Sequence, residues 1–248
     1  MTSGPVVLTT ATGSFPGLAE ALRARSVEVV EMPLLAFAPP VDWGEVDRAI
    51  GELARYRAVA FTSPRAATAF SHRWEANGGG TLPPLWAGGH GTAAALARWA
   101  NDVRTAPADE VGRMGAAAAL AAAMVRQRVA GPVLFPCGEI RRDELPARLR
   151  QEEIEVDEVV CYRPVLAGDA EAREAVRRAG ILMVASPTVA ELLARASAPT
   201  PRPPLLAVGP TTAAAARAAG WSPAAVAARP EVEALVAEVS SLLAGRPA

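Results

Sequence analysis

The sequence predicts two similar α/β domains with parallel sheets, joined by a two-stranded linker. Three observations predict this class. Short apolar runs alternate with helical patterns along the whole chain, the second half repeats the order of the first, and the ten strand candidates exceed what one compact sheet usually carries. The 248 residues are 51% hydrophobic, which supplies enough apolar surface for a core and excludes a disordered chain.

Each strand candidate is a short apolar or β-branched run, the composition typical of strands buried on both faces. In chain order the expected strands are Val6–Thr10, Val27–Met32, Ala58–Thr62, Leu85–Gly88, Val103–Thr105, Val133–Phe135, Ile154–Cys161, Ile181–Ala185, Leu205–Val208 and Ala224–Ala227. Helical patterns fill the intervals, and the segment Ala116–Ala123 has high helix propensity because it is almost all alanine. Another helix is expected to begin near Glu139 and to carry Arg141, Arg142 and Arg148. These arginines form either a solvated, ion-paired face, or one of them reaches the cleft to hold a carboxylate.

The internal repeat appears when the second half of the chain is laid over the first. The run Phe61-Thr62-Ser63-Pro64 corresponds to Val184-Ala185-Ser186-Pro187, and Ala87–Ala93 corresponds to Ala207–Ala213. Each half therefore contains the same series of strands, Ser-Pro turns and glycine turns, which indicates two copies of one structural unit.

Two extended segments occupy equivalent places in the repeat, and each contains a proline where a helix cannot continue. They lie near residues 33–40 and 160–166 and are expected to be the strands that connect the domains. One domain then comprises residues 1–36 and 166–248, and the other comprises residues 37–165. A double connection permits hinge motion and limits how far the domains separate.

The composition excludes several classes of function. All 25 basic residues are arginine, so Schiff-base chemistry and the lysine of a phosphate-binding P-loop are excluded. A net charge of -1 argues against nucleic acid as a partner. The chain has only two cysteines and two histidines, far apart in sequence, so neither a disulfide framework nor a metal site is expected.

The termini and the apolar runs favour a soluble, cytoplasmic protein. The first 18 residues lack a basic region and carry prolines inside their apolar part, unlike a signal peptide. The most apolar run, Met114–Val125, is too short to span a bilayer, so no membrane partner is expected.

Polar turns follow several predicted strands and precede helices. Serine and proline in Ser63-Pro64 and Ser186-Pro187-Thr188 make good helix starts, so capping alone would explain them. The alternative is anion binding, because ligands of open α/β sheets bind at the carboxyl ends of strands and helix N-termini offer free N–H groups. The next turns repeat this arrangement with Gly89, Thr92, Gly209, Thr211 and Thr212. Together the turns would point two anion-binding edges into one cleft between the domains.

Three further side chains carry candidate chemistry. Tyr162, in the second connecting segment, is either a packed strand aromatic or a proton donor to a leaving hydroxyl. Arg65 directly follows a Ser-Pro turn and is the best candidate to hold a carboxylate. His90 is a general acid or base, or a solvated residue of a glycine-rich turn; no Ser or Cys has a His/Asp pair that would indicate a nucleophile.

The order and spacing of four motifs resemble the uroporphyrinogen-III synthase family from about Val6 to Leu243. These motifs are Phe61–Ala66, Leu134–Gly138 with Arg142 and Leu145, Val160–Arg163 and Ala207–Ala213. The resemblance implies two α/β domains with the active site in the cleft between them. It also implies a hydro-lyase of porphyrin and heme biosynthesis that cyclises hydroxymethylbilane to uroporphyrinogen III, with loss of water and inversion of ring D.

The resemblance further implies a monomer with no metal or organic cofactor, whose partner is a polycarboxylate substrate. Tyr162 is the expected catalytic residue. Matching motifs give the expected substrate-binding residues: Ser63, Pro64, Arg65, Gly89, Thr92, Ser186, Thr188, Gly209, Thr211 and Thr212. The chain has Thr9-Thr10-Ala11-Thr12 where many bacterial members have an arginine, so a non-catalytic tetrapyrrole-binding or regulatory module of the same fold is the alternative.

Overall fold

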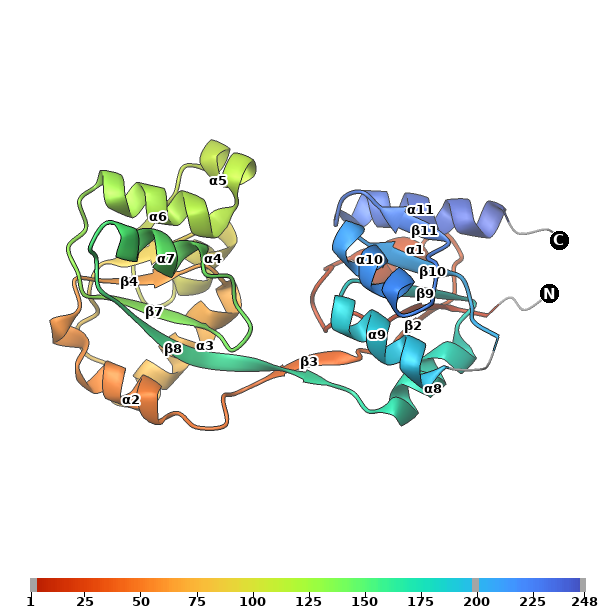
Figure 1. The fold of residues 1–248 in the computed structure, drawn as a ribbon, viewed down its shortest axis with the longest axis horizontal. Coiled ribbons are helices and arrows are strands. Elements are labelled where there is room, and N and C mark those ends of the chain that lie inside the picture. The colour runs from red at the N-terminus through yellow and green to blue at the C-terminus, as the bar shows by residue number, and fades with distance from the viewer. Residues whose placement is uncertain (1–3, 198–200, 246–248) are drawn as a thin grey trace. The chain divides into compact units, whose positions relative to one another are not determined.

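The computed structural model describes residues 4–197 and 201–245. The chain divides into two compact units, Met1–Phe37 with Val165–Ala248 (unit 1) and Ala38–Pro164 (unit 2). Each unit contains a parallel sheet with helices on both faces (Figure 1). The expected fold class, two α/β units with parallel sheets, is therefore confirmed. No helix within the described ranges combines the length and the apolarity needed to cross a membrane.

The sheet of unit 1 has the strand order β11-β10-β9-β1-β2. These strands are β1 (Val6–Leu8), β2 (Val29–Glu31), β9 (Ile181–Val184), β10 (Leu205–Val208) and β11 (Ala225–Ala227). One face is covered by α8 (Asp169–Arg178), α9 (Pro187–Ala196) and α10 (Pro210–Ala218), and the other by α1 (Leu18–Arg23) and α11 (Val232–Ala244). The central strands are buried on both faces, as their continuous apolar runs predict.

The sheet of unit 2 has the order β3-β8-β7-β4-β5-β6. Its strands are β3 (Leu35–Ala38), β4 (Ala58–Phe61), β5 (Leu85–Ala87), β6 (Val103–Thr105), β7 (Val133–Gly138) and β8 (Val156–Leu166). The helices α2 (Gly44–Gly51), α3 (Pro64–Ala76) and α4 (His90–Leu96) cover one face; α5 (Ala108–Met114), α6 (Ala116–Arg126) and α7 (Glu144–Gln151) cover the other. A short 3₁₀ helix, Leu53–Arg55, precedes β4.

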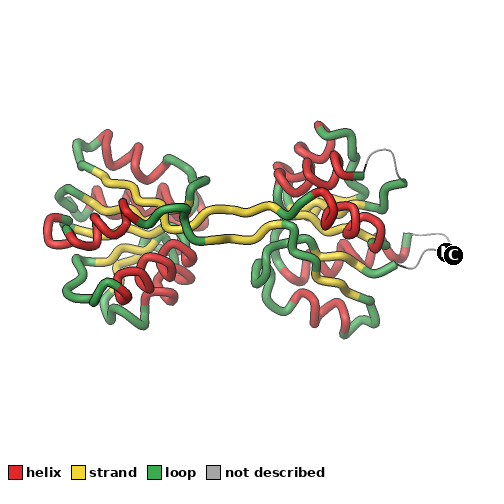
Figure 2. Tube along the Cα trace, turned by 90° about the horizontal axis from the view of Figure 1, so that it is seen from below, coloured by secondary structure: helices red, strands yellow, loops and turns green. Residues whose placement is uncertain are grey.

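The two sheets share one topology. Read from its other end, the order β6-β5-β4-β7-β8 of unit 2 matches the order β11-β10-β9-β1-β2 of unit 1, strand for strand. The internal repeat is therefore confirmed. Figure 2 shows β3 and β8 side by side where the chain passes between the units, and the two strands are hydrogen-bonded neighbours.

Several expected boundaries differ by a few residues from the observed ones, and two of the differences lie near the site. The first strand ends at Leu8 rather than at Thr10: Thr9 still donates its backbone N–H and its hydroxyl to the carbonyl of Met183, and a turn at Ala11–Ser14 then leads the chain away. The helix expected near Glu139 begins at Glu144, because β7 continues through Gly138 and a turn follows it. Arg141 and Arg142 therefore lie in a turn and not on a helix face.

The core of unit 2 yields the first prediction. The Phe70 side chain is 1% exposed and packs edge-on against Phe61, with ring centroids 5.7 Å apart. Phe70→Ala removes this contact and leaves a cavity, which should lower the free energy of unfolding of unit 2 by about 3–5 kcal/mol. Chemical denaturation of the full chain checks this. Val41→Ala is the control, because Val41 is 87% exposed and its truncation should shift the transition by less than about 0.5 kcal/mol.

Candidate active site

Tyr162 is placed by a close contact between neighbouring strands of unit 2. It lies in β8 beside the end of β7, where the pairing is irregular between Cys137 and Gly138. A Cβ atom on Gly138 would lie 2.6 Å from Cζ and 2.8 Å from the hydroxyl oxygen of Tyr162. A side chain at Gly138 would force the phenol ring to move, so glycine is what permits this close approach of Tyr162 to β7.

The start of α3 brings two more predicted residues to this phenol. Ser63 is the N-cap of α3, where its Oγ accepts a hydrogen bond from the N–H of Ala66, and it also lies 3.4 Å from the Tyr162 hydroxyl. The guanidinium carbon of Arg65 lies 5.6 Å from the centroid of the Tyr162 ring, within the range of a cation–π contact. Ser63, Arg65 and Tyr162 therefore meet at the carboxyl ends of β4 and β7, and Ser63 caps a helix as well as contacting the phenol.

A hollow of about 230 Å³ is lined in part by Tyr162. We call it the Tyr162 pocket; its lining includes Ser63, Gly115, Cys137, Gly138, Arg141 and Tyr162. Burial raises the pKa of Cys137 to about 11, and the nearby charge of Arg141 offsets only part of this. Because the thiolate is the reactive form, Cys137 is not an activated nucleophile at neutral pH. Among residues 4–197 and 201–245, no group of three or more His, Cys, Asp or Glu is placed to hold a metal ion.

The second polar turn of unit 2 lies next to the first. Gly89 is the N-cap of α4, and a Cβ on Gly91 would lie 3.9 Å from Cγ of Pro64, so the starts of α3 and α4 are neighbours. His90 is exposed, whereas Thr92 is 5% exposed. The side chain of Thr92 therefore packs inside unit 2, and a bulky replacement there would disturb the fold as well as any ligand.

Unit 1 holds the remaining predicted residues at equivalent places. Ser186 is the N-cap of α9, and its Oγ lies 2.8 Å from Oγ1 of Thr188. Gly209 precedes α10 with φ 85°, a left-handed conformation that favours glycine. Thr211 is exposed and Thr212 is 2% exposed, so these two neighbours on α10 face solvent and core, respectively.

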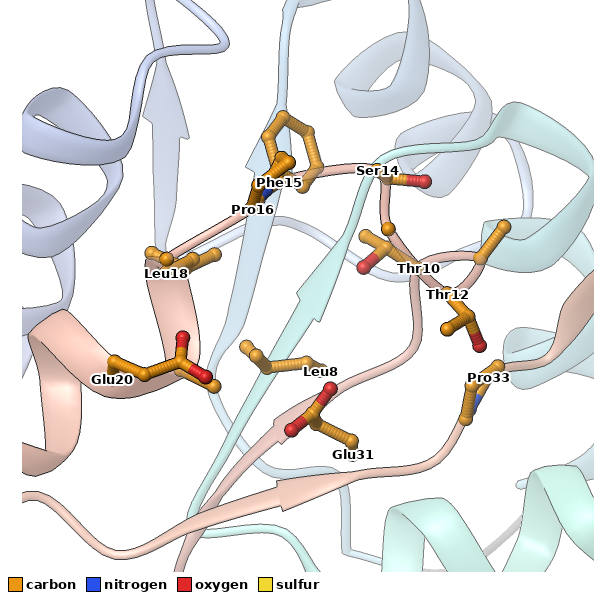
Figure 3. Close-up of a pocket in the computed structure, with 14 residues that line it drawn as sticks. Leu8, Thr10, Thr12, Ser14, Phe15, Pro16, Leu18, Glu20, Glu31 and Pro33 are labelled. Atoms are coloured by element: carbon orange, nitrogen blue, oxygen red, sulfur yellow. The ribbon is translucent and has the colours of Figure 1, made fainter. Parts of the chain in front are cut away.

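Unit 1 also contains a polar hollow that the sequence analysis did not identify. It has a volume of about 170 Å³ and follows β1. Figure 3 shows the hydroxyl groups of Thr10, Thr12 and Ser14 on its loop, with the carboxylates of Glu20 and Glu31 across from them. The available signal was the run of Thr, Ser and Gly between the first strand and the first helix. This loop offers hydroxyl groups in the segment where the chain departs from the arginine of many bacterial family members.

The fold and the site together define a class: α/β proteins with two parallel sheets that present hydroxyl, glycine and arginine groups at helix starts, where small anions bind. The model of one family within this class, described as uroporphyrinogen-III synthase HemD, matches residues 17–237, and the chain belongs to this family. The family expected from the sequence motifs is confirmed.

Two solved structures have a similar fold. A mutant uroporphyrinogen III synthase from the extremely thermophilic bacterium Thermus thermophilus is 16% identical, with a TM-score of 0.60 over 97% of this chain and 99% of that chain. The uroporphyrinogen-III synthetase from Helicobacter pylori is also 16% identical, with a TM-score of 0.60 over 96% of this chain and 99% of that chain. The comparison with curated proteins gives no match.

The close approach of Gly138 and Tyr162 yields the second prediction. Gly138→Ala places a methyl group against the phenol ring, so the ring must move, at a cost of about 1–3 kcal/mol in the free energy of unfolding. Gly112→Ala is the matched control, because Gly112 lies within α5 with nothing near its missing Cβ, and alanine there should stabilise the helix by up to about 1 kcal/mol. Thermal unfolding measures both; equal effects of the two substitutions would contradict the contact.

Proposed function

We propose that the protein is a uroporphyrinogen-III synthase. It cyclises hydroxymethylbilane with loss of water and inversion of ring D, acting as a cytoplasmic monomer in tetrapyrrole biosynthesis without a metal or organic cofactor. The observation that carries this proposal is the Tyr162 hydroxyl beside Ser63 and a pocket, at the carboxyl ends of two strands, in a chain of this family.

Tyr162 is the proposed proton donor. Its hydroxyl gives a proton to the terminal hydroxyl of the bilane, the C–O bond breaks, and the group leaves as water. The electron-rich pyrrole assists this departure, so a weak acid such as a phenol is sufficient. Ser63, at 3.4 Å, is close enough to orient the phenol hydroxyl, and Arg65 fixes the ring through its guanidinium group.

The larger task of the protein is orientation. An activated bilane that is left to itself closes without inversion, whereas attack through the substituted carbon of the last ring gives the spiro intermediate and then the inverted macrocycle. Holding the ring in that geometry is an effect of binding and not of acid strength. The phenol ring lies against Gly138 of the neighbouring strand β7, and we propose that its hydroxyl is the point against which the substrate ring is held.

The polar turns are the proposed carboxylate-binding sites. The chain has no lysine, so arginine, hydroxyl groups and helix N-termini must hold the substrate anions. The proposed residues are Ser63, Pro64, Arg65, Gly89 and Thr92 in unit 2 and Ser186, Thr188, Gly209, Thr211 and Thr212 in unit 1. Because Thr92 and Thr212 are buried, we propose that they act by shaping their turns.

Product analysis tests the function directly. With freshly generated hydroxymethylbilane, the purified protein should give mainly uroporphyrinogen III, faster than spontaneous closure. The products are oxidised to porphyrins and separated by chromatography. Formation of the uninverted isomer alone, at the spontaneous rate, would reject the enzyme and leave the alternative, a tetrapyrrole-binding or regulatory module.

Replacing Tyr162 tests the proposed proton donor. Tyr162→Phe should lower kcat by about 10²–10⁴-fold if the phenol is the only acid, with little change in stability. The matched control is Tyr56→Phe, because Tyr56, the other tyrosine of the chain, donates to Asp157 at 2.9 Å outside the pocket. That control should cost about 1 kcal/mol in the free energy of unfolding and leave kcat unchanged. Unchanged kcat in Tyr162→Phe removes this residue from the mechanism.

A further inference from the structure

Arg141 lines the Tyr162 pocket and is held there from one side. Its Nε donates to Oε2 of Glu158 at 2.6 Å, and its Nη2 lies 2.5 Å from the same oxygen. The side chain is 35% exposed, and its Nη1 donates no hydrogen bond to any residue in the described ranges. One edge of the planar guanidinium group is therefore occupied, and the other remains available to an anion.

Glu158 is itself held from two directions. Its side chain is 14% exposed, and its second oxygen, Oε1, accepts a hydrogen bond from Arg150 at 2.8 Å. Arg150 also donates to the backbone carbonyl of Val156 at 3.0 Å, so this arginine is tied to strand β8. Burial acts to raise the pKa of Glu158, but the hydrogen bonds from Arg150 and Arg141 outweigh it and lower the pKa. The carboxylate stays charged and fixed at neutral pH.

This arrangement differs from the surface ion pairs of the same unit. Arg148 on α7 and Glu152, the residue that follows the helix, form a typical exposed pair, 2.7 Å apart with side chains 50% and 38% exposed. Such pairs contribute little and position nothing. The carboxylate of Glu158 is far less exposed, and it links β8 to Arg141 of the pocket lining. Glu158 is therefore placed to hold the Arg141 side chain in position.

The residues that line the pocket carry a small positive charge, with Glu158 and Asp143 next to Arg141 outside the lining. The charged residues in its lining are Arg141, Arg142 and Glu144, so the lining carries one net positive charge. Arg142 and Glu144 lie 3.7 Å apart and largely offset each other, which leaves the open edge of Arg141 as the place for a negative group. A carboxylate suits this edge because its two oxygens match the planar N–H groups of a guanidinium.

We propose that Arg141 binds a carboxylate of the substrate in the Tyr162 pocket, and that Glu158 is a positioning residue that acts through Arg141. The proposal rests on the proposed function and adds to it a carboxylate subsite next to the phenol. A carboxylate held there ties one pyrrole ring of the bilane close to the Tyr162 hydroxyl. Arg141 contributes to binding and orientation, and it takes no part in proton transfer.

Steady-state kinetics of Arg141→Ala test the subsite. The loss of a charge-assisted hydrogen bond should raise KM for hydroxymethylbilane about 10- to 100-fold, whereas kcat should change much less. The KM of Arg141→Lys should lie between those of the wild-type protein and Arg141→Ala, because lysine keeps the charge and loses the planar pair of donors. Unchanged KM in a folded Arg141→Ala protein overturns the proposal. Folding of each variant is checked by circular dichroism and thermal unfolding.

A double-mutant cycle tests the positioning role of Glu158. Glu158→Gln should raise KM about 3- to 10-fold, and the double variant E158Q/R141A should be no worse than Arg141→Ala alone, because Glu158 acts only through Arg141. Glu152→Gln is the matched control: it breaks the exposed pair on α7 and should leave KM unchanged. Additive effects in the double variant reject the positioning role. If Glu158→Gln does not fold, Arg141→Ala and Arg141→Lys decide the subsite by themselves.

Binding of uroporphyrin III, the oxidised product, separates the subsite from the proposed function. Isothermal titration gives its Kd for the wild-type protein and for Arg141→Ala without any turnover. A wild-type protein that makes no uroporphyrinogen III rejects the proposed function, whereas a Kd that is weakened about 10-fold or more in Arg141→Ala still supports the subsite. An equal Kd in the two proteins rejects the subsite even if the wild-type protein is active.

Discussion

The site of unit 2 depends on the absence of a side chain at Gly138. Neighbouring strands lie close enough that any Cβ there would meet the ring of Tyr162, so glycine is what allows an aromatic residue of β8 to lie across the end of β7. From this contact follow the position of the phenol hydroxyl, its approach to Ser63 and the stacking of Arg65 near the ring. The irregular pairing between Cys137 and Gly138 falls at the same place. Such irregularities in strand pairs often re-aim a side chain beside a functional site.

The parallel topology explains why polar groups collect at one edge of each sheet. In a parallel sheet every strand ends at the same edge, and each following helix starts there with unpaired N–H groups. Both Ser-Pro turns and both glycine turns lie at such starts, in two sheets with the same strand order. Each unit thus repeats the same local feature, a polar residue or a glycine directly before a helix. Capping and anion binding use the same N–H groups, so the two interpretations of these turns do not exclude each other.

The sequence predicts features that depend on local chemistry and misses those that depend on distant pairing. The starts of α3 and α9 were predictable because Ser and Pro set them within two residues. The start of α7 was not, because the register of β7 against β8 decides where the strand stops. Spacing alone placed Arg141 on a helix and left its role open, whereas its partner Glu158 lies 17 residues away on β8. Likewise, the adjacent threonines of α10 look alike in sequence, and only the packing of the helix shows that Thr212 is buried and Thr211 is exposed.

The exclusive use of arginine has a structural consequence at this site. A guanidinium group is planar and has separate edges, so Glu158 can fix Arg141 through Nε and Nη2 while Nη1 remains available. An ammonium group in that position would be a compact point charge without a planar pair of donors. A chain without lysine therefore lacks amine chemistry, but each arginine can be held by a carboxylate on one edge and offer its other edge to an anion. For a substrate whose carboxylates must be held in defined directions, this combination of anchoring and binding is what orientation requires.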